Sequence, residues 1–193
     1  GEGSTGKLSA RPRPAVVPLS FAQQRMWVLN RIDPTSTSYN VSLALRLSGQ
    51  LDTDALAEAI TDVLARHETL RTRYPEVGGT GSQQVMSVTD VEWDTTPVPV
   101  RDRDVAEQVR TLLGTSFDVS TSVPVLVRIL ARSADEHILV LVVHHIAIDG
   151  FSLGPLTRDL MTAYAARSMG QEPGWAPLDV QYADFVLWQR DVL

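Results

Sequence analysis

Hydrophobic residues recur at helical spacing in five stretches of the chain. The first stretch opens with Ser20 and Gln23 in capping-box spacing, which predicts a helix over about 20–30. Asp52 or Thr53 would cap the second helix, which ends near residues 66–67. Further helices are predicted around 105–113, over about 152–167 and from about 180 onward. The apolar positions are Ala22, Met26 and Leu29 in the first helix, and Leu56, Ile60, Val63 and Leu64 in the second.

Three other stretches have the pattern of strands. Residues 41–47 alternate between apolar and polar side chains, and residues 125–132 and 137–145 are joined through the short segment 133–136. The run 137–145 is almost continuous Ile, Leu and Val, which is typical of a strand buried on both faces at the centre of a sheet. Residues 78–81 are predicted as a turn before a short strand near 84–86. This order of elements predicts an α/β sandwich, in which one mixed sheet is covered by helices.

Composition and charge exclude several classes of function for this chain. The chain of 193 residues is 44% hydrophobic, which is enough for a sizeable core. Its net charge of −6 argues against nucleic acid as a partner. The absence of cysteine excludes disulfides, thiolate metal sites and a cysteine nucleophile, and it fits a cytoplasmic location. The longest apolar run, 138–143, is far shorter than the roughly 20 residues of a membrane span, so no membrane association is expected.

Residues 1–14 differ in composition from the rest of the chain. They are rich in Gly, Ser, Thr and Pro, which cannot build a core. We interpret them as an interdomain linker or an expression tail, and residues 15–193 as the folded unit.

The segment that stands out chemically is His144-His145-Ile146-Ala147-Ile148-Asp149-Gly150, at the end of the predicted buried strand. Histidine titrates near neutral pH and can therefore act as a general base. Successive side chains on a strand point to opposite faces, so the two histidines are poorly placed to share a metal ion. Two satisfied core histidines remain an alternative to catalysis by one of them. Alternation alone does not say which of the pair would face a cavity.

Four segments, in this order, resemble the condensation domains of nonribosomal peptide synthetases. The seven residues from His144 match the HHxxxDG motif of that family, which related acyltransferases share. The other matching segments are Leu19–Trp27 (LSFAQQRMW), Arg66–Tyr74 (RHETLRTRY) and Tyr182–Gln189 (YADFVLWQ).

The resemblance implies a chloramphenicol-acetyltransferase-like fold of two lobes with the active site in a tunnel between them. This chain would supply the N-terminal lobe, with the C-terminal lobe absent, and we expect the isolated fragment to be inactive. The implied partners are donor and acceptor peptidyl carrier proteins and adjacent synthetase domains, including an adenylation domain. Substrates would arrive on the carriers' 4'-phosphopantetheine, with no cofactor or metal bound directly.

The resemblance also assigns roles within the motif. His145 would be the catalytic histidine, which deprotonates or orients the acceptor amine or steadies the tetrahedral intermediate. His144 and Gly150 belong to the same site, and the Gly150 backbone would lie near the oxyanion. Asp149 would be structural and would pair with Arg71, with Arg66 and Arg73 as nearby alternatives.

Three other functions remain as alternatives, and the first of them, epimerization, shares the HHxxxDG motif and the fold implied by the resemblance. An epimerization domain would invert the α-carbon of a carrier-bound residue. A non-catalytic platform would bind carriers or partner enzymes, and a carrier-independent acyltransferase would use coenzyme A. The sequence of the opening and Arg66–Tyr74 segments favours condensation.

Overall fold

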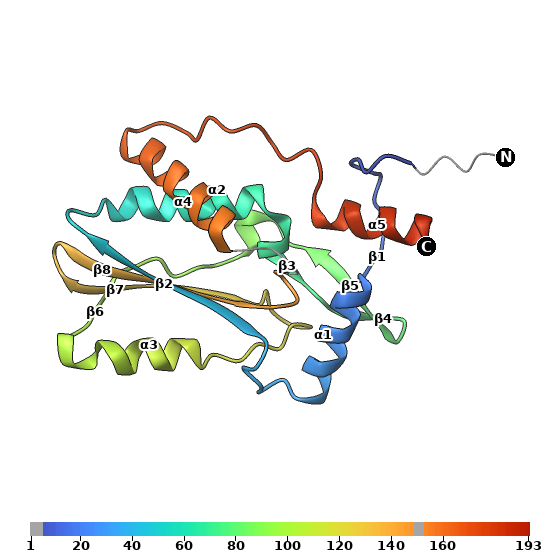
Figure 1. Ribbon diagram of the computed structural model, residues 1–193, viewed down its shortest axis with the longest axis horizontal. Coiled ribbons are helices and arrows are strands. Elements are labelled where there is room, and N and C mark those ends of the chain that lie inside the picture. The colour runs from blue at the N-terminus through green and yellow to red at the C-terminus, as the bar shows by residue number, and fades with distance from the viewer. Residues whose placement is uncertain (1–5, 149–152) are drawn as a thin grey trace.

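The main sheet lies at the centre of the fold. The computed structural model describes residues 6–148 and 153–193, and Figure 1 shows their arrangement. The strands pair in the order β2 (Asn40–Ser48), β8 (Glu136–His144), β7 (Val125–Ser133) and β6 (Val98–Pro99). Pairing is antiparallel between β2, β8 and β7 and parallel between β6 and β7. The predicted mixed sheet and the interior place of β8 are therefore confirmed.

Helices cover both faces of this sheet. Helices α2 (Thr53–Arg66) and α4 (Leu153–Ser168) lie on one face, and α3 (Val105–Leu113) lies on the other (Figure 1). Alternation along β8 divides the core, because Leu139 and Val143 pack toward α2 and α4 while Val140 and Val142 pack toward α3 and α1. The apolar stripe predicted for α2 is confirmed, since all four of its members are buried.

A smaller sheet and two further helices flank the main layers. Strand β5 (Thr80–Val85) pairs antiparallel with β1 (Val17–Pro18), β3 (Thr72–Arg73) and β4 (Glu76–Val77). Helix α1 (Phe21–Ile32) follows β1, and α5 (Tyr182–Val192) lies close to the N-terminal segment (Figure 1). Short 3-10 helices are η1 (Glu68–Arg71), η2 (Val88–Asp90) and η3 (Asp102–Asp104).

Helix α1 differs from its predicted apolar stripe. The capping box at Ser20 is confirmed, but Ala22 is exposed and the buried residues of the helix are Gln23 and Asn30. Asn30 donates to Phe117 O at 2.7 Å and accepts from Val119 N at 3.1 Å. Asn30 can occupy its buried position because backbone groups satisfy both ends of its amide.

The predicted turn over 78–81 is shorter than expected. Gly78 and Gly79 have φ values of 62° and 82°, which suit glycine, and the strand already begins at Thr80. Gly81 is part of β5, where a Cβ would lie 2.6 Å from Leu19 Cδ1 and 2.8 Å from Trp27 Cδ2. Trp27 is fixed there because its indole N–H donates to Tyr74 O at 2.9 Å.

Gly81→Ala is therefore expected to lower the free energy of unfolding by about 2 kcal/mol, because overpacking forces the indole or the strand to move. Chemical denaturation measures this change. Gly174→Ala is the matched control, since a Cβ at Gly174 would meet nothing within 4 Å. Equal stability of the two variants would contradict the close packing at Gly81.

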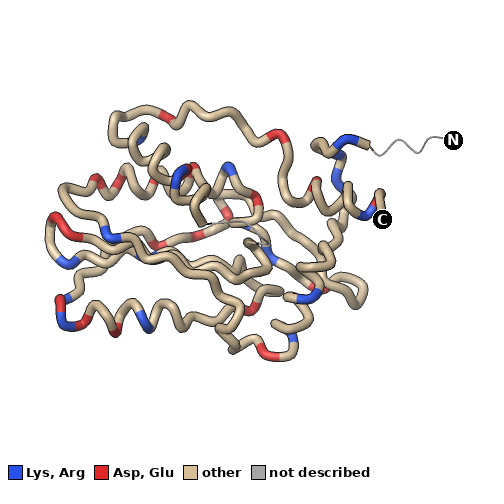
Figure 2. The backbone as a smooth tube through the Cα atoms, viewed as in Figure 1, with Lys and Arg blue, Asp and Glu red and all other residues tan. Residues whose placement is uncertain are grey.

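The charges of the described residues are mixed in sign. Figure 2 shows Lys and Arg interspersed with Asp and Glu along the helices and loops that surround the sheet. Among the helices in the described ranges, none is both long and apolar enough to cross a membrane.

Candidate functional site

The two histidines lie where β8 ends. His144 is its last residue, and its backbone N–H donates to Pro124 O at 3.0 Å. His145 follows the strand, and its N–H donates to Tyr39 O at 2.8 Å. The backbone then turns tightly, since Ala147 N donates to His144 O and Ile148 N to His145 O. Neighbouring segments on both sides thus hold the pair in place.

His144 is buried and serves the local structure. Its side chain is 2% exposed, and its Nδ1 accepts a hydrogen bond from Ile146 N at 3.0 Å. Burial, with a smaller contribution from His145, lowers the pKa of His144 to about 4. His144 is therefore neutral at physiological pH and holds the turn as an acceptor.

This burial gives a pH dependence with a definite sign. An unfolded histidine has a pKa of about 6.5, so between pH 6.5 and 4 the unfolded chain binds a proton at His144 that the folded chain does not. The stability contribution is complete above about pH 6.5 and is lost as the pH falls toward 4. In His144→Asn, an amide oxygen can still accept from Ile146 N without titrating. We expect denaturation curves of this variant to change less between pH 7 and 4.5 than those of the wild type, and equal changes would contradict the assignment.

His145 faces a cavity. Its side chain is half-buried, and it lines a cavity of about 240 Å³ together with the first turns of α1. The other lining residues are Ala22, Gln23, Arg25, Met26 and Ile146. The division that strand alternation predicted, with one histidine inward and one toward a cavity, agrees with this geometry. The structure adds which residue takes which place.

A second cavity lies beside the same turn. It has a volume of about 230 Å³, and Ile146 and Ala147 form part of its wall together with α5 and the start of η1. His67 also lines it, and its Nε2 lies 2.7 Å from Asp159 Oδ2. Ile146 lines both cavities, so the turn that follows His144 lies between them.

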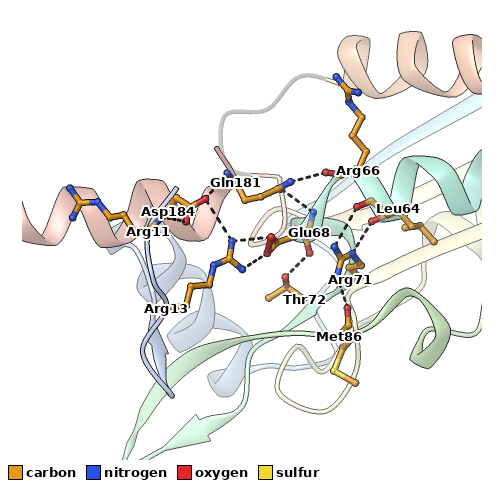
Figure 3. Close-up of polar contacts among 11 residues, drawn as sticks. Arg11, Arg13, Leu64, Arg66, Glu68, Arg71, Thr72, Met86, Gln181 and Asp184 are labelled. Atoms are coloured by element: carbon orange, nitrogen blue, oxygen red, sulfur yellow. Dashed lines mark hydrogen bonds and ion pairs between the residues drawn. The ribbon is translucent and has the colours of Figure 1, made fainter. Parts of the chain in front are cut away.

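Arg71 binds backbone carbonyls. Its guanidinium donates to Leu64 O at 3.0 Å, to Met86 O at 2.8 Å and to Ala65 O at 3.4 Å (Figure 3). These contacts join the last turn of α2 to the residue that follows β5. The predicted partner Asp149 and the predicted site residue Gly150 both lie outside the described residues. The Arg71–Asp149 pair stays a prediction.

The alternative partners for Asp149 are engaged elsewhere. Arg66 Nε lies 3.4 Å from Asp159 Oδ2, and its guanidinium stacks over the Trp175 ring at 4.6 Å. Arg73 Nε donates to Gln84 Oε1 at 2.7 Å.

The N-terminal segment and α5 both contact residues Arg66–Glu68, where α2 ends and η1 begins. Arg13 lies between two carboxylates, with Nη2 2.9 Å from Glu68 Oε1 and 3.7 Å from Asp184 Oδ2 (Figure 3). Gln181 donates to Arg66 O at 2.9 Å and accepts from Glu68 N at 3.2 Å. These bonds position α5, whose Tyr182 and Phe185 line the second cavity.

The described residues contain no group of three or more His, Asp or Glu side chains that could hold a metal ion. What the site does offer is one imidazole open to a cavity and backbone groups fixed around it. Such an arrangement suits proton transfer or orientation of a bound amine.

Sequence reasoning did not single out Gln23 as a site residue. It lines the cavity with His145 and is 1% exposed. The capping box could have pointed to it. In a capping box the glutamine uses its amide oxygen to accept from the N-cap backbone, so its NH₂ group needs another partner if the side chain is buried.

Comparison with protein families gives one match over most of the chain. The family model described as Condensation domain matches residues 14–193. The chain is 46% identical over 197 residues to CymA of Salinispora arenicola, which is described as a probable non-canonical nonribosomal peptide synthetase. It is 45% identical over 200 residues to the isonitrile lipopeptide synthase of Mycobacterium tuberculosis. Both matches cover 100% of the chain, which spans only 2% and 8% of these two proteins.

Solved structures show the same fold. The X-domain from teicoplanin biosynthesis, solved in complex with OxyB, has a TM-score of 0.85 at 37% identity and covers 96% of the chain. The starter condensation domain of rhizomide synthetase has a TM-score of 0.79 at 17% identity over 92% of the chain. The chain spans 40% and 44% of those two structures, and the predicted condensation-domain fold is confirmed.

Proposed function

Because the chain belongs to the condensation-domain family, we propose that it is the N-terminal lobe of a domain that forms amide bonds in nonribosomal peptide synthesis. The substrates would be aminoacyl or peptidyl thioesters on the phosphopantetheine arms of two carrier proteins. The observation that carries this proposal is that the two histidines have different environments. His144 is committed to the turn, whereas His145 presents its imidazole to a cavity.

The proposed reaction needs a single proton-handling group beside the substrates. The acceptor amine attacks the donor carbonyl carbon, so that a C–N bond forms, the C–S bond breaks and the donor carrier keeps its free thiol. The nitrogen loses one proton and the sulfur gains one. His145 would take or orient the proton of the amine, which requires no metal or redox cofactor. The roles of Asp149 and Gly150 remain proposals from the family motif.

A second candidate function has its own support. The likeness to the X-domain, which was solved in complex with OxyB, favours a domain that binds a partner protein. Epimerization of a single carrier-bound residue is the third possibility, because it uses a related fold.

One experiment separates the three. The complete condensation domain is incubated first with one aminoacyl-loaded carrier and then with both, and the released amino acids are analysed by chiral chromatography. Amide formation predicts no change with one carrier and a dipeptide with both. A changed D/L ratio with one carrier would assign epimerization, and no change in either mixture would leave the platform function.

A further inference from the structure

The amide of Gln23 is held in one orientation by the capping box of α1. Its Oε1 accepts from Ser20 N at 2.9 Å, while Gln23 N donates to Ser20 Oγ at 3.0 Å. A backbone N–H can only donate, so the atom that bonds to it must be the amide oxygen. The NH₂ group is therefore the free end of the side chain.

That NH₂ group is buried without a partner. Gln23 is 1% exposed, and its Nε2 makes no hydrogen bond with any residue that the structure describes. The Tyr74 hydroxyl is close by, and it donates to Ile146 O at 3.4 Å. Burial, together with Tyr182, raises the pKa of the Tyr74 phenol. The Gln23 side chain, which acts on the phenol as a donor without reaching the geometry of a hydrogen bond, offsets part of this effect. An unsatisfied buried N–H is rare in native proteins, which points to an acceptor supplied from outside the chain.

The cavity beside His145 is the place for such an acceptor. Gln23 and His145 line the same space of about 240 Å³. Gln23 also lies in the first turn of α1, where the helix dipole favours partial negative charge. The first turn, the unpartnered amide and the imidazole thus converge on one site.

We propose that Gln23 is a substrate-binding residue whose amide N–H donates a hydrogen bond to the acyl carbonyl oxygen of a thioester bound beside His145. The inference rests on the proposed amide-forming function and names a contact for it. An uncharged N–H donor is suited to a carbonyl oxygen. The hydrogen bond between them becomes stronger as that oxygen gains negative charge during attack by the amine.

The test uses two substitutions that separate the donor from the helix cap. Gln23→Glu keeps an oxygen to accept from Ser20 N, and Ser-x-x-Glu is itself a capping box, but the N–H donor is lost. Ser20→Ala removes the cap hydroxyl and keeps the donor. In the complete condensation domain, we expect Gln23→Glu to lower kcat/KM for amide formation at least about tenfold, and Ser20→Ala to lower it less than about threefold per folded molecule. Equal losses in both variants, or no loss in Gln23→Glu, would overturn the proposal.

A spectroscopic readout keeps the proposal testable even if no amide forms. The probe is an aminoacyl-pantetheine thioester labelled with ¹³C at its carbonyl, bound to the domain and followed by isotope-edited infrared spectroscopy. We expect the carbonyl stretch to shift to lower frequency on binding to the wild type and to Ser20→Ala, and to shift less in Gln23→Glu. The same shift in all three proteins would refute the contact. Failure of amide formation by the wild type would instead count against the proposed function.

Discussion

His145→Ala is expected to lower kcat/KM for amide formation by about 10²–10⁴-fold in the complete condensation domain, the range of a lost general acid–base group. The cavity on which His145 opens is lined by α1 residues and by Ile146. Among the side chains that line it, the His145 imidazole has a ring nitrogen that can accept a proton from an amine. Rates of amide formation from donor-loaded and acceptor-loaded carriers, stopped with acid at set times, measure the loss.

His137→Gln is the control for this substitution. His137 is a buried histidine of β8, and it lies at the end of the strand opposite to His145, about 25 Å away along an extended chain. We expect its rate per folded molecule to stay within about threefold of the wild type. A His145→Ala enzyme that keeps its rate, or equal losses in the two variants, would contradict a direct role for His145.

Arg71→Met is expected to give the largest loss of stability, about 3 kcal/mol in the free energy of unfolding, because three carbonyls lose a charged donor. Two of these carbonyls end α2, where helix geometry leaves them without partners, and the third belongs to Met86. Urea denaturation measures the change. Arg73→Met, which removes an exposed contact with Gln84, should cost less than about 1 kcal/mol.

The same variant tests the pairing with Asp149 that the family resemblance implies. In a double-mutant cycle with Asp149→Asn, a coupling energy of about 1 kcal/mol or more would support an ion pair. A coupling energy near zero, with the full loss still present in Arg71→Met, would leave the carbonyl contacts as the whole function of Arg71. No loss in Arg71→Met would contradict the contacts themselves.

Local sequence patterns predicted the elements where burial follows hydrophobicity. The helix over Thr53–Arg66 and the central strand that ends at His144 both bury the residues that periodicity indicated. Helix α1 was predicted less well, because Gln23 and Asn30 are buried through hydrogen bonds. Periodicity of apolar residues cannot detect a buried polar residue that bonds to backbone groups, as Gln23 does to Ser20 N and Asn30 does to Phe117 O.

Contacts between segments that are far apart in the sequence could not be predicted from local sequence patterns. Nothing near Arg13 in the sequence indicates that it lies between Glu68 and Asp184. Likewise, a strand pattern predicts that His144 and His145 diverge, but only the packing of α1 against the turn shows that His145 takes the cavity. The family motif indicated the same residue from resemblance, and the geometry supports that choice on separate grounds.

The most direct test of the central claim is the mass of the acceptor carrier. The complete condensation domain, as wild type or as His145→Ala, is mixed with a donor-loaded and an acceptor-loaded carrier, and both carriers are weighed by intact-protein mass spectrometry. Our account predicts that the wild type adds the donor residue to the acceptor carrier and frees the donor arm, and that His145→Ala does so far more slowly. An acceptor carrier of unchanged mass with the wild type, or equal gain with both enzymes, would contradict it.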